Sequence, residues 1–296
     1  MMAKMVDSVF VNRHQQIVNR RKISTRKLYA NVGNEIVRMG QGSKPLQGIE
    51  GESVPLASPS LMKGSMTMKP LRVLVVGWTA TTGGIEHFLM AYCGKMNRKH
   101  VQFDFLCRFS PIACQKEAEK IGKIYTITRR SSDIMRYYRE INDFFREHGH
   151  EYDIIWDNEC MFNDMTPLKK AAEVGIPVRI AHCHNPQNMD KSVIGHVQGF
   201  LHRVNHHSLS RYANVLWACS MESAKWACPA LDLPCEVIPN AIDAQMFRFS
   251  EQVRREVREQ YGLEDCLVVG HVGRLQYQKN QTFLLDAFRH LHEREE

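Results

Sequence analysis

Long apolar runs are missing from this chain of 296 residues, and so is any CxxC cysteine pair. No apolar stretch approaches the roughly 18 residues of a membrane-spanning helix, so none is expected. The N-terminus lacks the apolar core of a secretory signal, which argues against export. The nine cysteines are odd in number. Together these absences favour reduced thiols in a cytoplasmic protein.

Two short catalytic motifs are also absent. Gly77 and Gly83 are six residues apart, so the dinucleotide fingerprint GxGxxG is not formed, which counts against a nicotinamide- or flavin-dependent enzyme. No GxSxG elbow surrounds Ser220, so a hydrolase nucleophile is not expected there. Ser220 instead stands where a hydroxyl would cap the following helix.

The net charge of +7 comes from one end of the chain. Residues 1–70 contain eleven Lys or Arg and four Asp or Glu, whereas the remaining 226 residues carry 28 charges of each sign. The body of the protein is therefore neutral, and composition offers no basic face for a nucleic acid.

Residues 1–70 are interpreted as a leader of low order, because they show little apolar periodicity. Three readings stay open. The segment is a basic arm for anionic lipid, an organelle transit peptide, or an over-extended start that precedes the natural beginning at Met66 or Met68.

From Leu71 onward, short apolar runs alternate with helical patterns. This β-α alternation predicts an α/β fold, a doubly wound parallel sheet of Rossmann-like type with ligands at the carboxyl ends of its strands. Strands are expected at residues 71–77, 101–107, 123–127, 153–158, 178–182 and 214–220, and a second series begins with a strand at 266–272. Helices are expected at residues 85–96, 112–121, 131–149, 167–174, 192–211, 221–227, 251–261 and from 281.

Gly83 and Gly84 stand where the first helix of the α/β body is expected to begin. Backbone amides at a helix start, unobstructed by side chains, can hold an anion such as a diphosphate. The alternative is a tight turn that needs glycine for a positive φ.

The strand at 178–182 leads into His182, Cys183 and His184. Adjacent strand residues point to opposite faces, so the two histidines share a side while the cysteine faces away. No second ligand pair accompanies them, and no metal is expected. A catalytic or substrate-orienting histidine fits better, with an ordinary rim histidine as the alternative. The helix that follows carries four histidines and two arginines over residues 195–213 and reads either as solvated or as facing an anionic membrane.

Gly273 and Arg274 end the expected strand at 266–272, and Lys279 follows just before the next helix. A guanidinium and an ammonium that converge beside a helix start form a site for a diphosphate.

In order and spacing, four segments resemble the retaining glycosyltransferases of family 4, which have the two-domain GT-B architecture. They are TTGGIEHFL, RIAHCHN, CEVIPNAIDAQMF and VGRLQYQKN, and the resemblance runs from Leu71 to the end of the chain. It implies that Gly83, Gly84 and Gly273 face the donor diphosphate, that Arg274 and Lys279 grip it, and that His184 is the active-site histidine. The nearest members are bacterial enzymes of exopolysaccharide or capsule assembly.

The resemblance also implies a domain organisation. Residues 71–235 would form the N-terminal acceptor domain, and residues 236–296 would begin a nucleotide-sugar domain that ordinary domain sizes would extend to about 150 residues. The Glu-x7-Glu segment of the family is not in this sequence. We therefore expect a C-terminally truncated chain that is impaired in turnover.

The expected function is transfer of a hexose from a nucleotide-diphosphate sugar, a UDP-sugar in the first place, to a glycan or lipid-linked acceptor. No cofactor and no metal are expected. The location would be cytoplasmic, with peripheral contact at the inner face of the plasma membrane. The alternative is a non-catalytic fragment that binds an acceptor or partner. A dinucleotide-dependent epimerase or dehydrogenase is disfavoured by the missing fingerprint.

Overall fold

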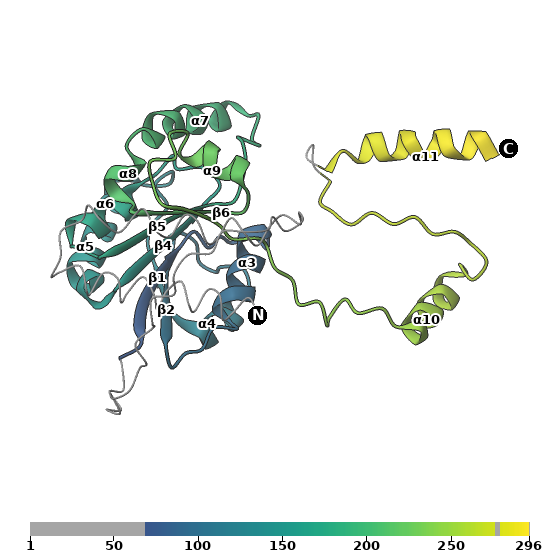
Figure 1. The fold of residues 1–296 in the computed structure, drawn as a ribbon, viewed down its shortest axis with the longest axis horizontal. Helices are drawn as coiled ribbons and strands as arrows, with labels where there is room; N and C mark the ends of the chain where they lie inside the picture. Colours follow the sequence, from purple (N-terminus) through teal and green to yellow (C-terminus); the bar gives the residue numbers. More distant parts are fainter. Residues whose placement is uncertain (1–68, 276–278, 296) are drawn as a thin grey trace, which may run out of the picture. The chain divides into compact units, whose positions relative to one another are not determined.

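The computed structural model describes residues 69–275 and 279–295, and strands alternate with helices along most of this length (Figure 1). The leader expected at residues 1–70 lies outside the described residues except for its last two positions. The strands are β1 (Leu71–Val76), β2 (Val101–Cys107), β3 (Gly122–Thr126), β4 (Ile154–Glu159), β5 (Val178–Cys183), β6 (Val215–Ala218) and β7 (Cys235–Val237). The helices are α3 (Gly84–Cys93), α4 (Gln115–Ile121), α5 (Ile134–His148), the 3-10 turn η2 (Gly149–Glu151), α6 (Thr166–Glu173), α7 (Val193–His206), α8 (Leu209–Tyr212), α9 (Met221–Ala227), α10 (Glu251–Tyr261) and α11 (Gln281–Glu295).

The seven strands form one sheet in the order β3-β2-β1-β4-β5-β6-β7. β1 pairs in parallel with β2 and β4, β2 with β3, and β6 with β7. The central strands are nearly continuous apolar runs because both faces of such a sheet are covered, and β1 is buried at every position except Arg72. The predicted α/β fold with a parallel sheet is confirmed.

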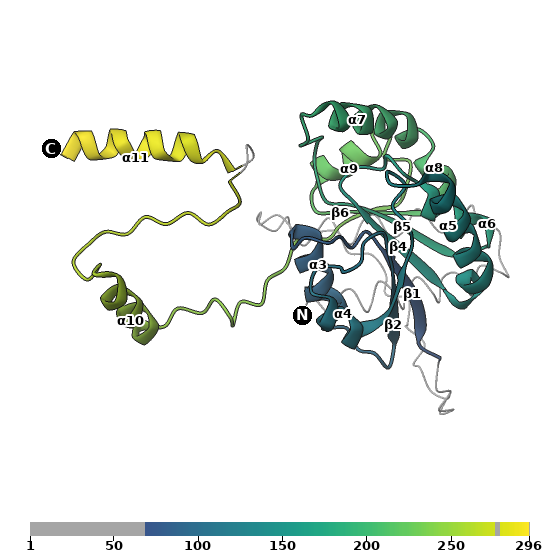
Figure 2. The same cartoon turned by 180° about the vertical axis from the view of Figure 1, so that it is seen from behind.

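The helices of the first strands lie on opposite faces of the sheet. The chain moves outward from β1 through α3 to β2 and through α4 to β3, then returns through α5 to β4. Right-handed crossovers place α3 and α4 on one face and α5 and α6 on the other, as Figures 1 and 2 show. The order in which strands are added to the sheet therefore reverses between β1 and β4, although the two strands run parallel.

Contacts within the chain divide it into two units. Among the described residues, the first unit contains 69–158, Thr166–His182 and Arg211–Val215, and the second contains Glu159–Met165, Cys183–Ser210 and 216–295. The domain boundary expected near residue 235 stays a prediction. In the part of the chain that the structure describes, no helix combines the length and hydropathy needed to cross a bilayer.

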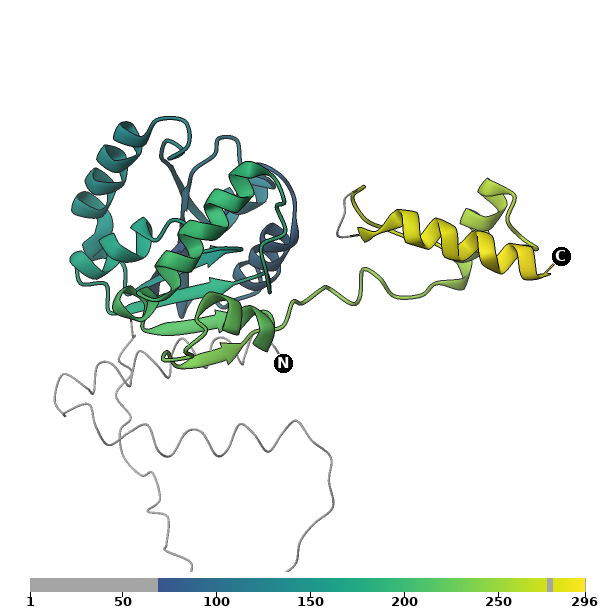
Figure 3. The ribbon, with the colours of Figure 1, turned by 90° about the horizontal axis from the view of Figure 1, so that it is seen from above.

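The predicted strand at residues 266–272 is wrong. This segment is irregular, and it joins α10 to α11 (Figure 3). Leu267 and Val272 are 91% and 98% exposed. A β-strand is stable only when a neighbour accepts its backbone hydrogen bonds, and no described strand pairs with this run. The helices predicted on either side, α10 and α11, are both formed.

Gly77 follows β1 and cannot carry a side chain. Its φ is +109°, and a Cβ built on it would lie 1.9 Å from the backbone oxygen of Asn158 in β4. We expect Gly77→Ala to lower the free energy of unfolding by about 3 kcal/mol or more, because backbone strain adds to the clash. Urea titration measures this loss.

Gly84→Ala is the matched control. A Cβ at Gly84 meets nothing within 4 Å, so alanine there should change stability by less than about 1 kcal/mol, in the stabilising direction. Equal effects of the two substitutions would contradict the close approach at Gly77.

Candidate functional site

The carboxyl ends of β1 and β4 lie side by side where the strand order reverses, which is where doubly wound sheets bind ligands. Gly77 lies at the end of β1. In β4 the Asn158 side-chain amide donates to the carbonyl oxygens of Val76 at 3.3 Å and Trp156 at 3.1 Å. The hydrogen bond from this amide to Val76 joins the two strand ends, and the absence of a side chain at Gly77 lets them approach closely.

Gly83 and Gly84 occupy the predicted place at a helix start. Gly83 is the N-cap of α3, and no side chain caps the first turn. The tight-turn alternative is wrong: Gly83 is extended, with φ −147° and ψ −166°, and neither glycine has a positive φ. Since Gly84 is exposed and a Cβ there would meet only open space, the fold itself does not require glycine at this position. Access to the backbone from outside is then the property that glycine provides.

Glu86 is a site residue that the sequence did not reveal. It lies in the first turn of α3 and is only 3% exposed. Its Oε1 accepts hydrogen bonds from the Thr79 backbone amide at 3.1 Å and from the Thr79 hydroxyl at 2.7 Å. Its Oε2 lies 3.0 Å from the position of a Cβ on Gly83. A carboxylate thus already lies in the positive field of the α3 N-terminus, where it is stabilised and where it opposes a second anion.

His184 lies just beyond the end of β5, among residues of the second unit. Its backbone amide donates to the Glu159 carbonyl at 3.0 Å, and its carbonyl oxygen accepts from the Cys219 thiol at 3.3 Å. Desolvation lowers the pKa of the His184 imidazole to about 4. The ring is therefore neutral at pH 7, with one nitrogen able to donate and the other able to accept a hydrogen bond.

His182 has a different environment. It is fully buried, its Nδ1 accepts from the Trp156 indole at 3.1 Å, and its ring meets Phe88 of α3 edge-on at 4.9 Å. The aromatic contacts make His182 part of the packing beneath α3.

His202 was expected on a solvated, histidine-rich helix, and for this residue the expectation is wrong. The side chain is fully buried. Its Nδ1 accepts from the Phe162 backbone amide at 3.0 Å, and its Nε2 lies 3.0 Å from the Trp226 carbonyl oxygen. The ring also stacks on Trp226 at 4.3 Å. A signal was present, since the position is seven residues after Gly195 and three after Gly199 on one helical face.

Gly273, Arg274 and Lys279 form a local group in the second unit. A Cβ on Gly273 would lie 3.2 Å from Cγ of Lys279, so the lysine stem passes over the glycine. The Arg274 carbonyl accepts from the Gln281 side chain at 2.8 Å, which ties this turn to the start of α11. Both cationic residues are exposed. Their convergence with Gly83, Gly84 and His184 on one donor stays a prediction.

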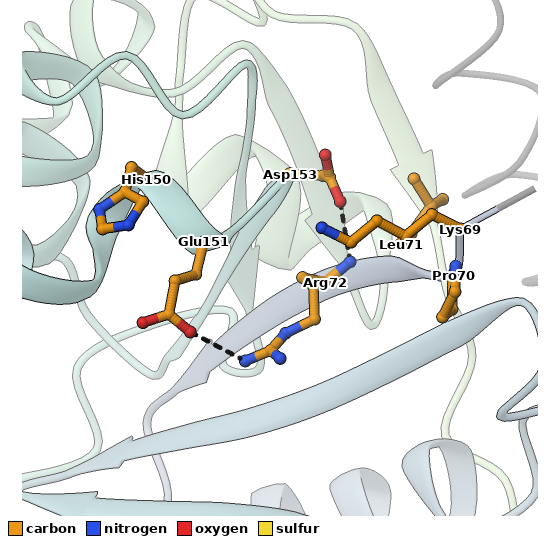
Figure 4. A pocket seen from close by; sticks show the side chains of 7 residues that line it. All are labelled: Lys69, Pro70, Leu71, Arg72, His150, Glu151 and Asp153. Atoms are coloured by element: carbon orange, nitrogen blue, oxygen red, sulfur yellow. Dashed lines mark hydrogen bonds and ion pairs between the residues drawn. The ribbon is translucent and has the colours of Figure 1, made fainter.

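A pocket of about 450 Å³ lies at the opposite, amino ends of the strands (Figure 4). Arg72 reaches across it and pairs with Asp104 and with Glu151 at 3.5 Å, while its backbone amide donates to Asp153 at 2.9 Å. Because these carboxylates already compensate the guanidinium, the pocket is a structural network and offers no free charge from Arg72 to a ligand. The lining residues are Lys69, Pro70, Leu71, Arg72, His150, Glu151 and Asp153.

The chain is an α/β protein of the type that binds ligands at the carboxyl edge of its sheet, because its strand order reverses between β1 and β4 and the start of α3 is open there.

No family model matches the sequence. The chain is 28% identical over 236 residues to a Bacillus subtilis (strain 168) protein named "Putative glycosyltransferase EpsF", with 77% of this chain and 60% of that protein covered.

Among solved structures, the chain resembles the Anabaena protein Alr3699/HepE in complex with UDP and glucose. The TM-score is 0.52 at 19% identity, over 74% of this chain and 57% of that one. At this identity the likeness shows the fold alone. The chain thus spans about 60% of the length of the proteins it matches. The similarity to the B. subtilis protein supports a relationship to glycosyltransferases.

Glu86→Gln tests whether the α3 start receives an anion. The amide oxygen can still accept from Thr79, so the loop geometry is kept while one negative charge is removed. If Gly83 and Gly84 hold a diphosphate, calorimetry should show pyrophosphate binding several-fold tighter than in the native chain, since a like charge a few ångströms away is worth about 1 kcal/mol in water. Glu117→Gln, an exposed carboxylate in the first turn of α4, is the control. Unchanged or weaker binding would remove the diphosphate role of this turn.

His202 should make stability depend on pH. Burial lowers the pKa of its imidazole to about 4 from an ordinary 6.5, so between these values the unfolded chain binds a proton that the folded chain does not. Stability should be fully present above pH 6.5 and fall as the pH drops towards 4. His184 contributes in the same window.

Replacement by His202→Leu leaves the Phe162 amide and the Trp226 carbonyl without their partner. We expect it to cost about 2–4 kcal/mol at pH 7 and to flatten the pH profile between 6.5 and 4. His87→Leu, on the exposed side of α3, is the control. Urea unfolding at a series of pH values measures both, and an unaltered slope in His202→Leu would contradict the assignment.

Proposed function

We propose that this chain is part of a retaining glycosyltransferase of family 4, with the GT-B fold. The reaction is transfer of a hexose from a nucleotide-diphosphate sugar, with UDP as the nucleotide, to a glycan or lipid-linked acceptor. The observation that carries the proposal is the similarity to a B. subtilis glycosyltransferase over 77% of this chain. The carboxyl-edge site of a parallel sheet is compatible with it.

The proposed chemistry is electrostatic. In the reaction the bond between the sugar carbon and the diphosphate oxygen breaks, the acceptor hydroxyl attacks that carbon from the same face, and the hydroxyl proton passes to the leaving diphosphate. Negative charge develops on the leaving diphosphate, and fixed cations and amide dipoles stabilise it without a metal. Arg274 and Lys279 supply the cations, and the amides beside Gly83, Gly84 and Gly273 supply the dipoles. The neutral His184 imidazole orients a sugar hydroxyl.

The proposed setting is the synthesis of an exopolysaccharide or capsule. The protein would work in the cytoplasm, at the inner face of the plasma membrane, because lipid-linked acceptors are presented there. Contact with the membrane would be peripheral.

Calorimetric titration with UDP tests the proposal on the chain as it stands. We expect UDP to bind, and Arg274→Ala to weaken binding by about 10- to 100-fold, since a hydrogen bond to a charged group contributes about 1.5–3 kcal/mol. The control is Arg289→Ala, because Arg289 is also an exposed arginine, on α11, and its ion-pair partners lie on the same helix.

Equal losses in the two variants would contradict the role of Arg274. If UDP does not bind to the native chain at all, the donor-binding function falls, and the non-catalytic binding module becomes the better description.

A further inference from the structure

Helix α7 packs through its smallest residues. The inward side carries Gly195, Gly199 and His202, all buried. The Asn188 side chain donates to the Gly195 carbonyl at 2.8 Å, and a Cβ on Gly199 would lie 2.8 Å from the same amide nitrogen. The glycines are therefore needed for the loop before α7 to lie against the helix.

The large apolar residues of α7 point outward instead. Val193, Val197, Phe200 and Val204 are 81%, 55%, 62% and 55% exposed. Their spacing of four, three and four residues places them in one stripe along the helix. An ordinary surface helix directs such a stripe to the core. This reversed arrangement predicts that another apolar phase covers the stripe, which we call the α7 stripe.

One acid, Asp190, lies just before α7, where its carboxylate accepts from the Ser192 amide at 2.9 Å, and the charged side chains that follow it are positive or imidazole. No Asp or Glu occurs between Lys191 and Met221. His196, Arg203 and His207 are exposed and follow one edge of the stripe at spacings of seven and four residues. Lys191 precedes the helix. The charge around the stripe therefore complements an anionic surface.

We propose that the α7 stripe docks on a bilayer that contains anionic phospholipids. Val193, Val197, Phe200 and Val204 enter the boundary between headgroups and acyl chains, and the edge with Arg203 meets the lipid phosphates. This inference deepens the membrane contact of the proposed function by naming the surface and the lipid class. Because α7 begins nine residues after His184, docking would hold the proposed acceptor side next to lipid-linked substrates.

A second copy of the chain fits the stripe less well. A helix of 14 residues is about 21 Å long and about 10 Å wide, so one face offers roughly 200 Å². Stable protein interfaces need about 800 Å² from each partner. A two-fold contact would also place the same positively charged patch on both sides of the interface, since such interfaces repeat one surface. A lipid surface has neither requirement.

Vesicle flotation with the full chain tests this inference. Native protein should float with vesicles of phosphatidylglycerol and phosphatidylcholine and should bind pure phosphatidylcholine at least about fivefold less, since each cation near an anionic surface contributes about a factor of five. Val197→Gln/Phe200→Gln should lower binding to the anionic vesicles by about tenfold or more. Arg203→Gln should lower it about fivefold.

Val253→Gln/Val257→Gln on α10 is the matched control, because these valines are 55% and 45% exposed on a helix that also carries acids. Circular dichroism and urea unfolding should show that the exposed substitutions leave the fold unchanged. A Phe200→Trp reporter should shift its emission to the blue on anionic vesicles.

Several outcomes would overturn the proposal. They are no vesicle binding by native protein, equal binding by the α7 and α10 variants, or light scattering that shows a dimer abolished by Val197→Gln/Phe200→Gln without any lipid binding. None of these readouts needs a sugar donor. Failure of lipid docking can therefore be told apart from failure of glycosyl transfer, which the UDP titration reports.

Discussion

The close approach of β1 and β4 is the constraint on which the site depends. A side chain on Gly77 would collide with the Asn158 carbonyl, and the amide of Asn158 in turn holds the Val76 carbonyl. With the strand ends this near, the chain leaves β1 and begins α3 at the carboxyl edge of the sheet. The exposed start of α3 therefore lies at the edge where the backbones of β1 and β4 approach each other closely.

The start of α3 already contains one negatively charged side chain, which the two glycines in the sequence did not suggest. The Glu86 carboxylate is buried in the first turn of α3 and is satisfied by Thr79. An anionic ligand there would have to share the positive end of the helix with a resident carboxylate. In the second unit, the neutral His184 ring can form hydrogen bonds without adding charge. In the proposed donor site the cations are Arg274 and Lys279, both of which are exposed.

Local signals in the sequence were sufficient for much of the fold. The bounds of α10 follow from Ser250, whose hydroxyl accepts from the Val253 amide, and from Gly262, whose φ is +63°. The strand predicted at 266–272 required a partner strand, which no local pattern specifies. Glu86 and His202 were missed for a related reason. Each is polar, and its burial depends on a hydrogen bond that forms only in the folded chain, from the Thr79 amide to Glu86 and from the Phe162 amide to His202.

The imidazole of His202 has a mechanical consequence. One rigid ring on α7 is bonded at one nitrogen to the backbone of Phe162 and lies within hydrogen-bond distance of the Trp226 carbonyl at the other, with the indole stacked on its face. Because the imidazole ring is rigid, a tilt of α7 would displace the segments that contain Phe162 and Trp226 together. One side chain thus joins α7, the loop that follows β4 and the end of α9 at a single point.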